Sequence, residues 1–134
     1  MPPRIPPVVA LLLDALLVVV FAAIGRATHD GDVLGPGGSG LATTAWPFLV
    51  ALLIAWVALR AWRYPSAPVR TGLPVWAITV AGGIALRAAS GQGVAPAFIV
   101  VAAVTLLLLI PGWRALARLA KRAGLRKRTA SGRR

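Results

Sequence analysis

The sequence predicts an all-α membrane protein, with a four-transmembrane-helix bundle followed by a basic, amphipathic C-terminal helix. Composition is the first reason, because 58% of the residues are hydrophobic and only 13% are charged, too few to cover a soluble domain. The second reason is a series of four apolar stretches, each close to the ~20 residues that cross a bilayer. We therefore expect a transmembrane domain over residues 1–112 and a basic cytoplasmic tail over residues 113–134.

The four spans are expected at residues 7–24, 44–62, 73–89 and 94–110. Thr43 or Thr44 is expected to cap the second helix, with Pro47 in its first turn. The pair Pro111-Gly112 predicts the end of the fourth helix. Small residues in the third span, among them Gly82-Gly83, predict close helix packing, either within the bundle or between protomers of a homo-oligomer.

The first apolar stretch also resembles a signal peptide, because Arg4 precedes it and Ala22-Ala23 lies near its end. Two features favour a helix that stays in the membrane. The stretch is long for a signal peptide, and it contains Asp14.

The distribution of basic residues predicts the orientation, because Lys and Arg accumulate in cytoplasmic loops. With both termini in the cytoplasm, Arg26 and Arg87 are the outer arginines, out of 15 Lys and Arg in the chain. We expect a multi-pass protein of the cell (inner) membrane with cytoplasmic N- and C-termini.

The basic tail is predicted to contact membrane lipids. Residues 113–125 place leucines on one helical face and basic residues around the other. Such a helix lies on the anionic inner leaflet, so the basic residues from Arg114 to Arg134 are expected to bind anionic lipid, with disorder from residue 126 onward. The tail has no aromatic residue other than Trp113, so we expect no specific nucleic-acid partner.

The two halves of the sequence share one pattern. Each has an arginine at the outer end of the outgoing helix, a proline in the first turn of the returning helix, and Trp-Arg at its inner end. In the order of the two copies these are Arg26 and Arg87, Pro47 and Pro96, and Trp62-Arg63 and Trp113-Arg114. The pattern indicates a parallel repeat of two tandem helical hairpins. Alternatively, membrane hairpins share such end signals without duplication.

Arg26 and Arg87 end the first and third spans on the outer side, where the second and fourth spans begin. Helix N-termini carry partial positive charge and free N–H groups. One hypothesis is therefore an outer mouth that attracts an anion such as a phosphate, a carboxylate or a lipid headgroup, with His29 in the loop above it. The sequence favours the alternative, in which both arginines extend separately to outer headgroups.

Asp14 lies inside the first span, about 9 Å past Val8 at 1.5 Å per residue. A carboxyl group at that depth needs a partner. Arg60, at a comparable depth in the second span, is the expected partner, and Thr79 is an expected hydrogen-bond donor. This intramembrane site either fixes helix packing or provides a protonatable group on a transport path. Trp56 also lies within the membrane and needs an acceptor for its indole N–H.

Side chains for catalysis or metal binding are scarce. The chain has one His, three acidic residues and no Cys. His29-Asp30-Gly31-Asp32 lacks a fourth ligand, so a turn is favoured over a metal site, and one His cannot supply two axial haem ligands. We expect no catalytic residue, no metal and no cofactor, and the protein is not expected to be an enzyme.

A set of motifs occurs along residues 12–116: Asp14, Gly25-Arg26, His29, Trp46-Pro47-Phe48, Trp56, Arg87 with Ser90-Gly91-Gln92-Gly93, Phe98 and Gly112-Trp113-Arg114. As a set they resemble an uncharacterised family of small bacterial and archaeal four-helix membrane proteins, a domain of unknown function. The resemblance implies the four-helix bundle and transfers no activity.

Two functions are compatible with these observations. One is a small carrier or channel-like subunit for an anionic or lipid-like solute, which enters between Arg26 and Arg87 and passes Asp14. The other is a structural or accessory membrane protein that binds lipid or a larger membrane complex. The first is the more specific expectation.

Overall fold

The computed structural model of this chain describes residues 4–29 and 33–132, except for the side chains of residues 28 and 29. They form four long helices, α1 (Pro7–His29), α2 (Ser39–Leu59), α3 (Leu73–Ala89) and α4 (Pro96–Ser131), and three short helical turns, η1 (Pro36–Gly38), η2 (Ala61–Arg63) and η3 (Pro68–Gly72). The described part of the chain contains no β-strand. The predicted all-α, four-helix architecture is confirmed.

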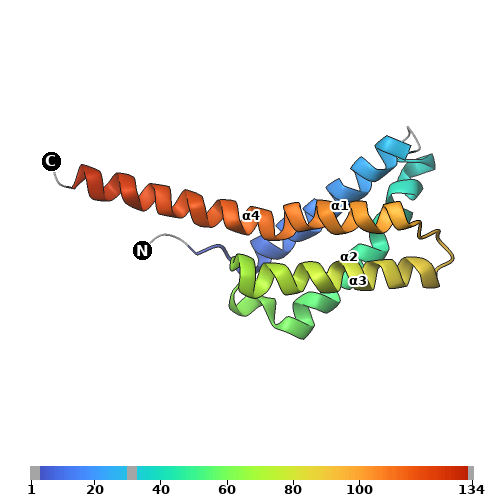
Figure 1. Ribbon diagram of the computed structural model, residues 1–134, viewed down its shortest axis with the longest axis horizontal. Helices are drawn as coiled ribbons and strands as arrows, with labels where there is room; N and C mark the ends of the chain where they lie inside the picture. The colour runs from blue at the N-terminus through green and yellow to red at the C-terminus, as the bar shows by residue number, and fades with distance from the viewer. Residues whose placement is uncertain (1–3, 30–32, 133–134) are drawn as a thin grey trace.

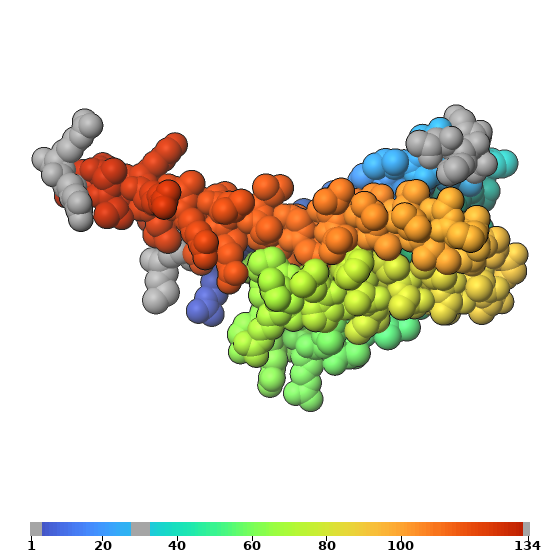
Figure 2. Space-filling model, in the orientation of Figure 1, coloured from blue at the N-terminus to red at the C-terminus, as the bar shows by residue number. Residues whose placement is uncertain are grey.

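The helices form two consecutive hairpins (Figure 1). The α1–α2 and α3–α4 connections lie at one end of the molecule, which we call the hairpin end. The N-terminal segment, the α2–α3 connection and the C-terminal part of α4 lie at the opposite end, which we call the termini end. There α4 continues well past the other helices, and Figure 2 shows this extension projecting from the bundle.

Each of the four long helices, in the residues that are described, is long and apolar enough to cross a membrane. Their outer surfaces carry large apolar side chains that a soluble protein would bury, such as Leu12, Val57 and Leu108, which are 63%, 68% and 69% exposed. Surrounding hydrocarbon accounts for this exposure, because lipid tails are as apolar as these side chains. The chain is therefore a multi-pass membrane protein.

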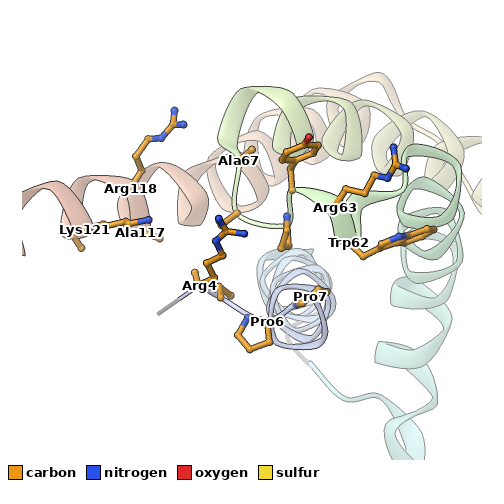
Figure 3. Close-up of a pocket in the computed structure, with 14 residues that line it drawn as sticks. Arg4, Pro6, Pro7, Trp62, Arg63, Ala67, Ala117, Arg118 and Lys121 are labelled. Atoms are coloured by element: carbon orange, nitrogen blue, oxygen red, sulfur yellow. The ribbon is translucent and has the colours of Figure 1, made fainter. Parts of the chain in front are cut away.

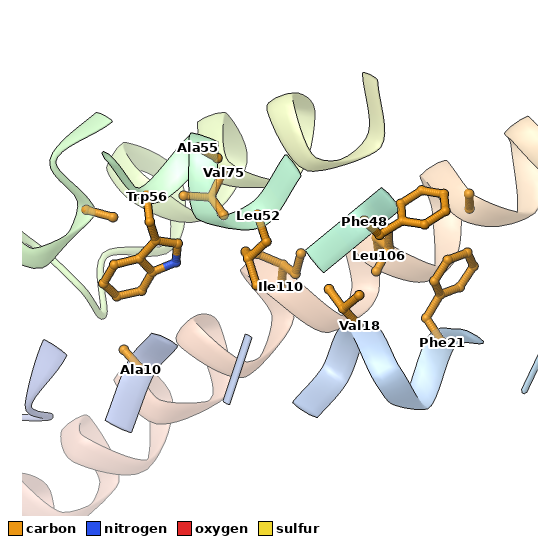
Figure 4. Close-up of a cluster of buried hydrophobic side chains, with 12 residues drawn as sticks. Ala10, Val18, Phe21, Phe48, Leu52, Ala55, Trp56, Val75, Leu106 and Ile110 are labelled. Carbon is orange, nitrogen blue, oxygen red and sulfur yellow. The ribbon is translucent and has the colours of Figure 1, made fainter. Parts of the chain in front are cut away.

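Buried side chains from the four helices meet inside the bundle (Figure 4). Phe21 of α1 and Phe48 of α2 pack edge to face, with ring centroids 5.2 Å apart. Phe98 of α4 lies 6.3 Å and 6.1 Å from these two rings. Such tilted and edge-on arrangements suit the quadrupoles of aromatic rings. Leu52 and Leu106, both 0% exposed, extend the core toward the termini end.

α3 packs closely on α2 because two glycines leave no side chain between the helices. A Cβ atom on Gly83 would collide with the ring of Phe48, and one on Gly82 would lie 3.0 Å from Cβ of Ala51. Small residues permit this approach of helix backbones in lipid. The glycine pair therefore packs within the bundle.

The predicted start of α2 at Thr43 or Thr44 is wrong. The helix begins at Ser39, after Gly38, whose left-handed conformation (φ 81°) closes the η1 turn. The hydroxyl groups of both threonines donate to backbone carbonyls one turn earlier, as interior helical residues do. Pro47 consequently lies inside α2, and the carbonyl of Thr43, four residues before it, receives no helical N–H.

The predicted end of α4 at Pro111-Gly112 is also wrong, because α4 continues to Ser131. Pro111 is buried against η3, where a Cβ atom on Gly72 would lie 3.1 Å from the Cα of the proline. Proline removes only one backbone donor, and in a membrane no water competes for the remaining helical bonds. The helix therefore passes through the proline, and the disorder expected from residue 126 onward is not found up to Ser131.

Gly83→Ala tests the packing of α3 on α2. We expect this variant to lower the free energy of unfolding by about 1–3 kcal/mol, since the new methyl group must displace the ring of Phe48. Gly112→Ala is the matched control, because nothing lies within 4 Å of a Cβ atom there and alanine favours a helix. The free energy of unfolding of both variants is measured in detergent micelles, with circular dichroism as the probe of unfolding. Equal stability of the two variants would contradict the close packing.

Candidate functional site

A buried ion pair joins α1 to α4 near the termini end. The carboxylate of Asp14 accepts two hydrogen bonds from the guanidinium group of Arg114, from Nη1 to Oδ1 at 2.8 Å and from Nη2 to Oδ2 at 2.7 Å. Both side chains are 0% exposed. In this bidentate contact the planar guanidinium group and the carboxylate match each other in shape and charge.

Two indole groups complete the surroundings of the carboxylate. Nε1 of Trp56 in α2 donates to Oδ2 of Asp14 at 2.9 Å, and Nε1 of Trp113 in α4 donates to Oδ1 at 2.8 Å. The acceptor that Trp56 needs is therefore Asp14. Each carboxylate oxygen accepts two hydrogen bonds, which uses the capacity of an ionised carboxylate.

Arg114 is held by further contacts. Its Nε donates to the carbonyl of Pro65 at 2.8 Å, and its Nη1 donates to the carbonyl of Ile110 at 3.0 Å. Pro65 belongs to the α2–α3 connection, so these contacts link α1, α2, α4 and this connection. A buried pair with its polar atoms satisfied fixes how the helices pack. We call the set of four side chains the Asp14 cluster: Asp14, Trp56, Trp113 and Arg114.

The predicted partners of Asp14 are not the observed ones. Arg60 ends α2 in a left-handed conformation (φ 50°), and its side chain is exposed. Thr79 is fully buried in α3, but its Oγ1 has no hydrogen-bond partner among the described residues. Arg114 takes the place assigned to Arg60 because α4 stays helical past Pro111. Arg114 is therefore not part of the lipid-facing tail to which the sequence assigns it.

A second candidate site lies at the hairpin end, where a pocket of about 540 Å³ is lined chiefly by α1 and α4. Arg26 and Arg87 both line this pocket, so the structure brings together the two arginines of the predicted outer mouth. Most of the remaining walls are apolar, with side chains that include Phe21, Ala22, Ile24, Phe98 and Val101. We call it the hairpin-end pocket.

Arg87 is positioned by the α3–α4 connection. Its Nε donates to the carbonyl of Gly93 at 2.8 Å, and its Nη1 donates to Oε1 of Gln92 at 2.9 Å. Gln92 in turn donates to the carbonyl of Thr43 at 3.1 Å, the carbonyl that Pro47 leaves without a helical donor. These partners of Arg87 are neutral, so among the described residues no carboxylate offsets its charge.

Arg26 has a similar setting at the end of α1. Its Nε donates to the carbonyl of Val33 at 2.9 Å, much as Arg87 donates to a carbonyl that follows α3. A Cβ atom on Gly40 would collide with the guanidinium group, so glycine makes room for it. The side chain of His29 lies outside the described residues, and its part in the outer mouth stays a prediction. No three His, Cys, Asp or Glu side chains in the described ranges are placed to hold a metal ion.

A family model described as "Protein of unknown function (DUF3054)" matches residues 11–117. The chain belongs to this family. Comparisons with curated proteins and with solved structures give no match. In this DUF3054 protein the matched region contains the whole Asp14 cluster and both arginines of the hairpin-end pocket. The predicted resemblance to an uncharacterised family is thus confirmed, and no activity comes with it.

The buried face of α4 contains the signal that identifies Arg114 in the DUF3054 fold. Ala102, Leu106 and Ile110 recur every four residues, and all are 0% exposed. Arg114 is the next member of this series, and Asp14 belongs to a comparable buried series in α1. This periodicity is overlooked when the helix is expected to end at Pro111, because Arg114 then lies outside the helix. The sequence contains no such signal for Gln92. Its partner is the carbonyl of Thr43, which lacks a helical donor because α2 begins at Ser39 and so places Pro47 inside the helix.

The two halves of the DUF3054 protein resemble each other most at the hairpin end, where Arg26 and Arg87 make the same kind of contact. At the termini end the two halves differ. Trp62 is 46% exposed in the η2 turn, whereas Trp113 donates to the buried carboxylate. The shared Trp-Arg pattern therefore has two different structural settings.

Asp14→Asn tests the ion pair, because it leaves the charge of Arg114 buried without a counter-ion. We expect the free energy of unfolding to fall by about 3–5 kcal/mol. Arg60→Gln is the control, since it removes an exposed arginine outside the cluster, and we expect it to change stability by less than about 0.5 kcal/mol. Thermal unfolding in detergent compares the two. If Asp14→Asn proves as stable as Arg60→Gln, the pair does not hold the bundle together.

Proposed function

We propose that the protein is an accessory membrane protein that binds an anionic amphiphile, such as an anionic lipid, in the hairpin-end pocket. The observation that carries this proposal is the presence of Arg26 and Arg87 in a pocket whose other walls are mostly apolar. Such a lining suits a ligand with a negative head and an apolar chain. The proposed role is binding, without catalysis.

Arg87 is the main anchor in this proposal. Gln92 and Gly93 hold its guanidinium group at the pocket through neutral contacts, and its central carbon lies 4.3 Å from the ring centroid of Phe98. A side chain positioned in this way has already lost conformational freedom, which lowers the entropic cost of binding an anion. Its charge is available to a ligand because its hydrogen-bond partners are neutral.

We also propose that the termini end faces the cytoplasm, so that the hairpin-end pocket opens at the outer leaflet of the cell membrane. The 15 Lys and Arg residues support this orientation. All of them except Arg26 and Arg87 come from segments that lead to or from the termini end, and such residues accumulate on the cytoplasmic side.

The Asp14 cluster favours the accessory role over a carrier or channel-like subunit. A solute moving along α1 and α4 from the hairpin-end pocket to the termini end meets this cluster, which lies between the two ends on both helices. The carboxylate already accepts four hydrogen bonds. It therefore offers no open acceptor for a passing proton or cation, and a structural role for Asp14 fits better.

Arg87→Gln tests the anchor. In phosphatidylcholine nanodiscs, we expect the wild-type protein to bind spin-labelled phosphatidylglycerol in preference to spin-labelled phosphatidylcholine. Arg87→Gln should reduce this preference by about five- to tenfold, the effect of losing one charge-assisted contact. Electron spin resonance of the immobilised lipid fraction measures the preference.

Two further variants separate charge from structure. Arg87→Lys keeps the charge but loses the planar fork, so it should retain most of the preference. Arg70→Gln removes a charge at the termini end, where Arg70 stacks on Tyr64, and should leave the preference unchanged. An equal preference for phosphatidylglycerol in the wild-type protein and in Arg87→Gln would contradict the proposal.

A further inference from the structure

A second pocket, of about 840 Å³, lies at the termini end. It is bounded by the N-terminal segment, the α2–α3 connection and the extension of α4 (Figure 3). Four exposed basic side chains from these three segments line it: Arg4, Arg63, Arg118 and Lys121. We call it the termini-end pocket.

No described carboxylate offsets the charge of the termini-end pocket. The chain has three acidic residues. Asp14 is used by its own cluster, and Asp30 and Asp32 lie outside the described residues. The start of α1 adds positive potential, because Pro6 and Pro7 line the pocket and no acidic residue occupies the first turn. In the described part of the chain, the pocket therefore carries several positive charges and no carboxylate that offsets them.

The surroundings of this pocket indicate the depth of lipid headgroups. Leu116 and Leu119 of the α4 extension do not line the pocket and are 68% and 59% exposed, so this face of the helix suits contact with hydrocarbon. Trp62 and Tyr64 line the pocket and are 46% and 48% exposed. Tryptophan and tyrosine with such partial exposure are typical of the interface between hydrocarbon and headgroups.

We infer that the termini-end pocket binds the phosphate-bearing headgroup of an anionic lipid from the adjacent leaflet. Guanidinium and ammonium groups bind phosphate oxygens through charge-assisted hydrogen bonds, and basic pockets next to transmembrane helices are typical sites for anionic headgroups. The headgroup supplies the counter-charge that the described protein lacks and bridges three chain segments. The two pockets share no lining residue, so this inference stands independently of ligand binding at the hairpin end.

Cross-linking with a headgroup-photoactivatable phosphatidic acid in phosphatidylcholine nanodiscs tests the inference on the full chain. We expect saturable labelling of the pocket-lining residues, which are residues 62–67 together with Ala117, Arg118, Ala120 and Lys121. The double variant Arg118→Gln/Lys121→Gln should raise the lipid fraction needed for half-maximal labelling by about thirtyfold, the combined effect of losing two contacts to the headgroup in the pocket. Both side chains are exposed, so the variant should fold normally.

The matched control is Arg122→Gln/Arg126→Gln, which removes the same charge from the same helix at positions outside the pocket lining. It should change half-maximal labelling much less. An equal loss in the two double variants would mean that only general surface charge attracts the lipid, and the inference would be wrong.

Discussion

The buried contact between Asp14 and Arg114 determines how the helices are arranged. A charged pair away from water is costly unless its polar atoms all have partners. Meeting that requirement fixes α1 against α4, brings Trp56 of α2 to the carboxylate, and holds the α2–α3 connection through Pro65. It also requires α4 to stay helical through Pro111. The lipid-facing apolar surfaces supply no comparable specificity, since they are equally well solvated in any arrangement.

The hairpin end is organised by neutral hydrogen bonds around a cation. Pro47 releases the carbonyl of Thr43, Gln92 donates to this carbonyl, and the amide oxygen of Gln92 accepts from Arg87. The hydrogen-bond partners of Arg87 are therefore neutral, whereas the charge of Arg114 is paired with Asp14 inside the protein. The same residue type thus has neutral partners at one end of the bundle and a carboxylate partner near the other, and the proposed binding role of Arg87 rests on this difference.

Local signals in the sequence were sufficient for the helical class and the four spans, because length and apolar composition decide which segments cross a bilayer. The need of Asp14 for a buried partner also followed, from the cost of a charge in lipid. The identity of that partner could not be predicted from local signals, because it depended on whether α4 continues past Pro111. A helix end at Pro111 separates Arg114 from the buried series of Ala102, Leu106 and Ile110. The packing of Pro111 against Gly72 in η3 joins segments that are distant in sequence, so it is not visible in the local pattern. The convergence of Arg26 and Arg87 was predictable, since two helix ends that face the same side of a membrane bring their arginines to one surface.

The five tryptophan indole groups provide the most direct test of the Asp14 cluster. In a ¹H–¹⁵N spectrum of the protein in micelles, the indole N–H groups of Trp56 and Trp113 should exchange slowly with water. Both resonances should shift together in Asp14→Asn, because both groups donate to that carboxylate. The resonance of Trp62, 46% exposed, should not move. If the Trp56 and Trp113 resonances stay in place in Asp14→Asn, or exchange as fast as that of Trp62, the Asp14 cluster does not organise the bundle.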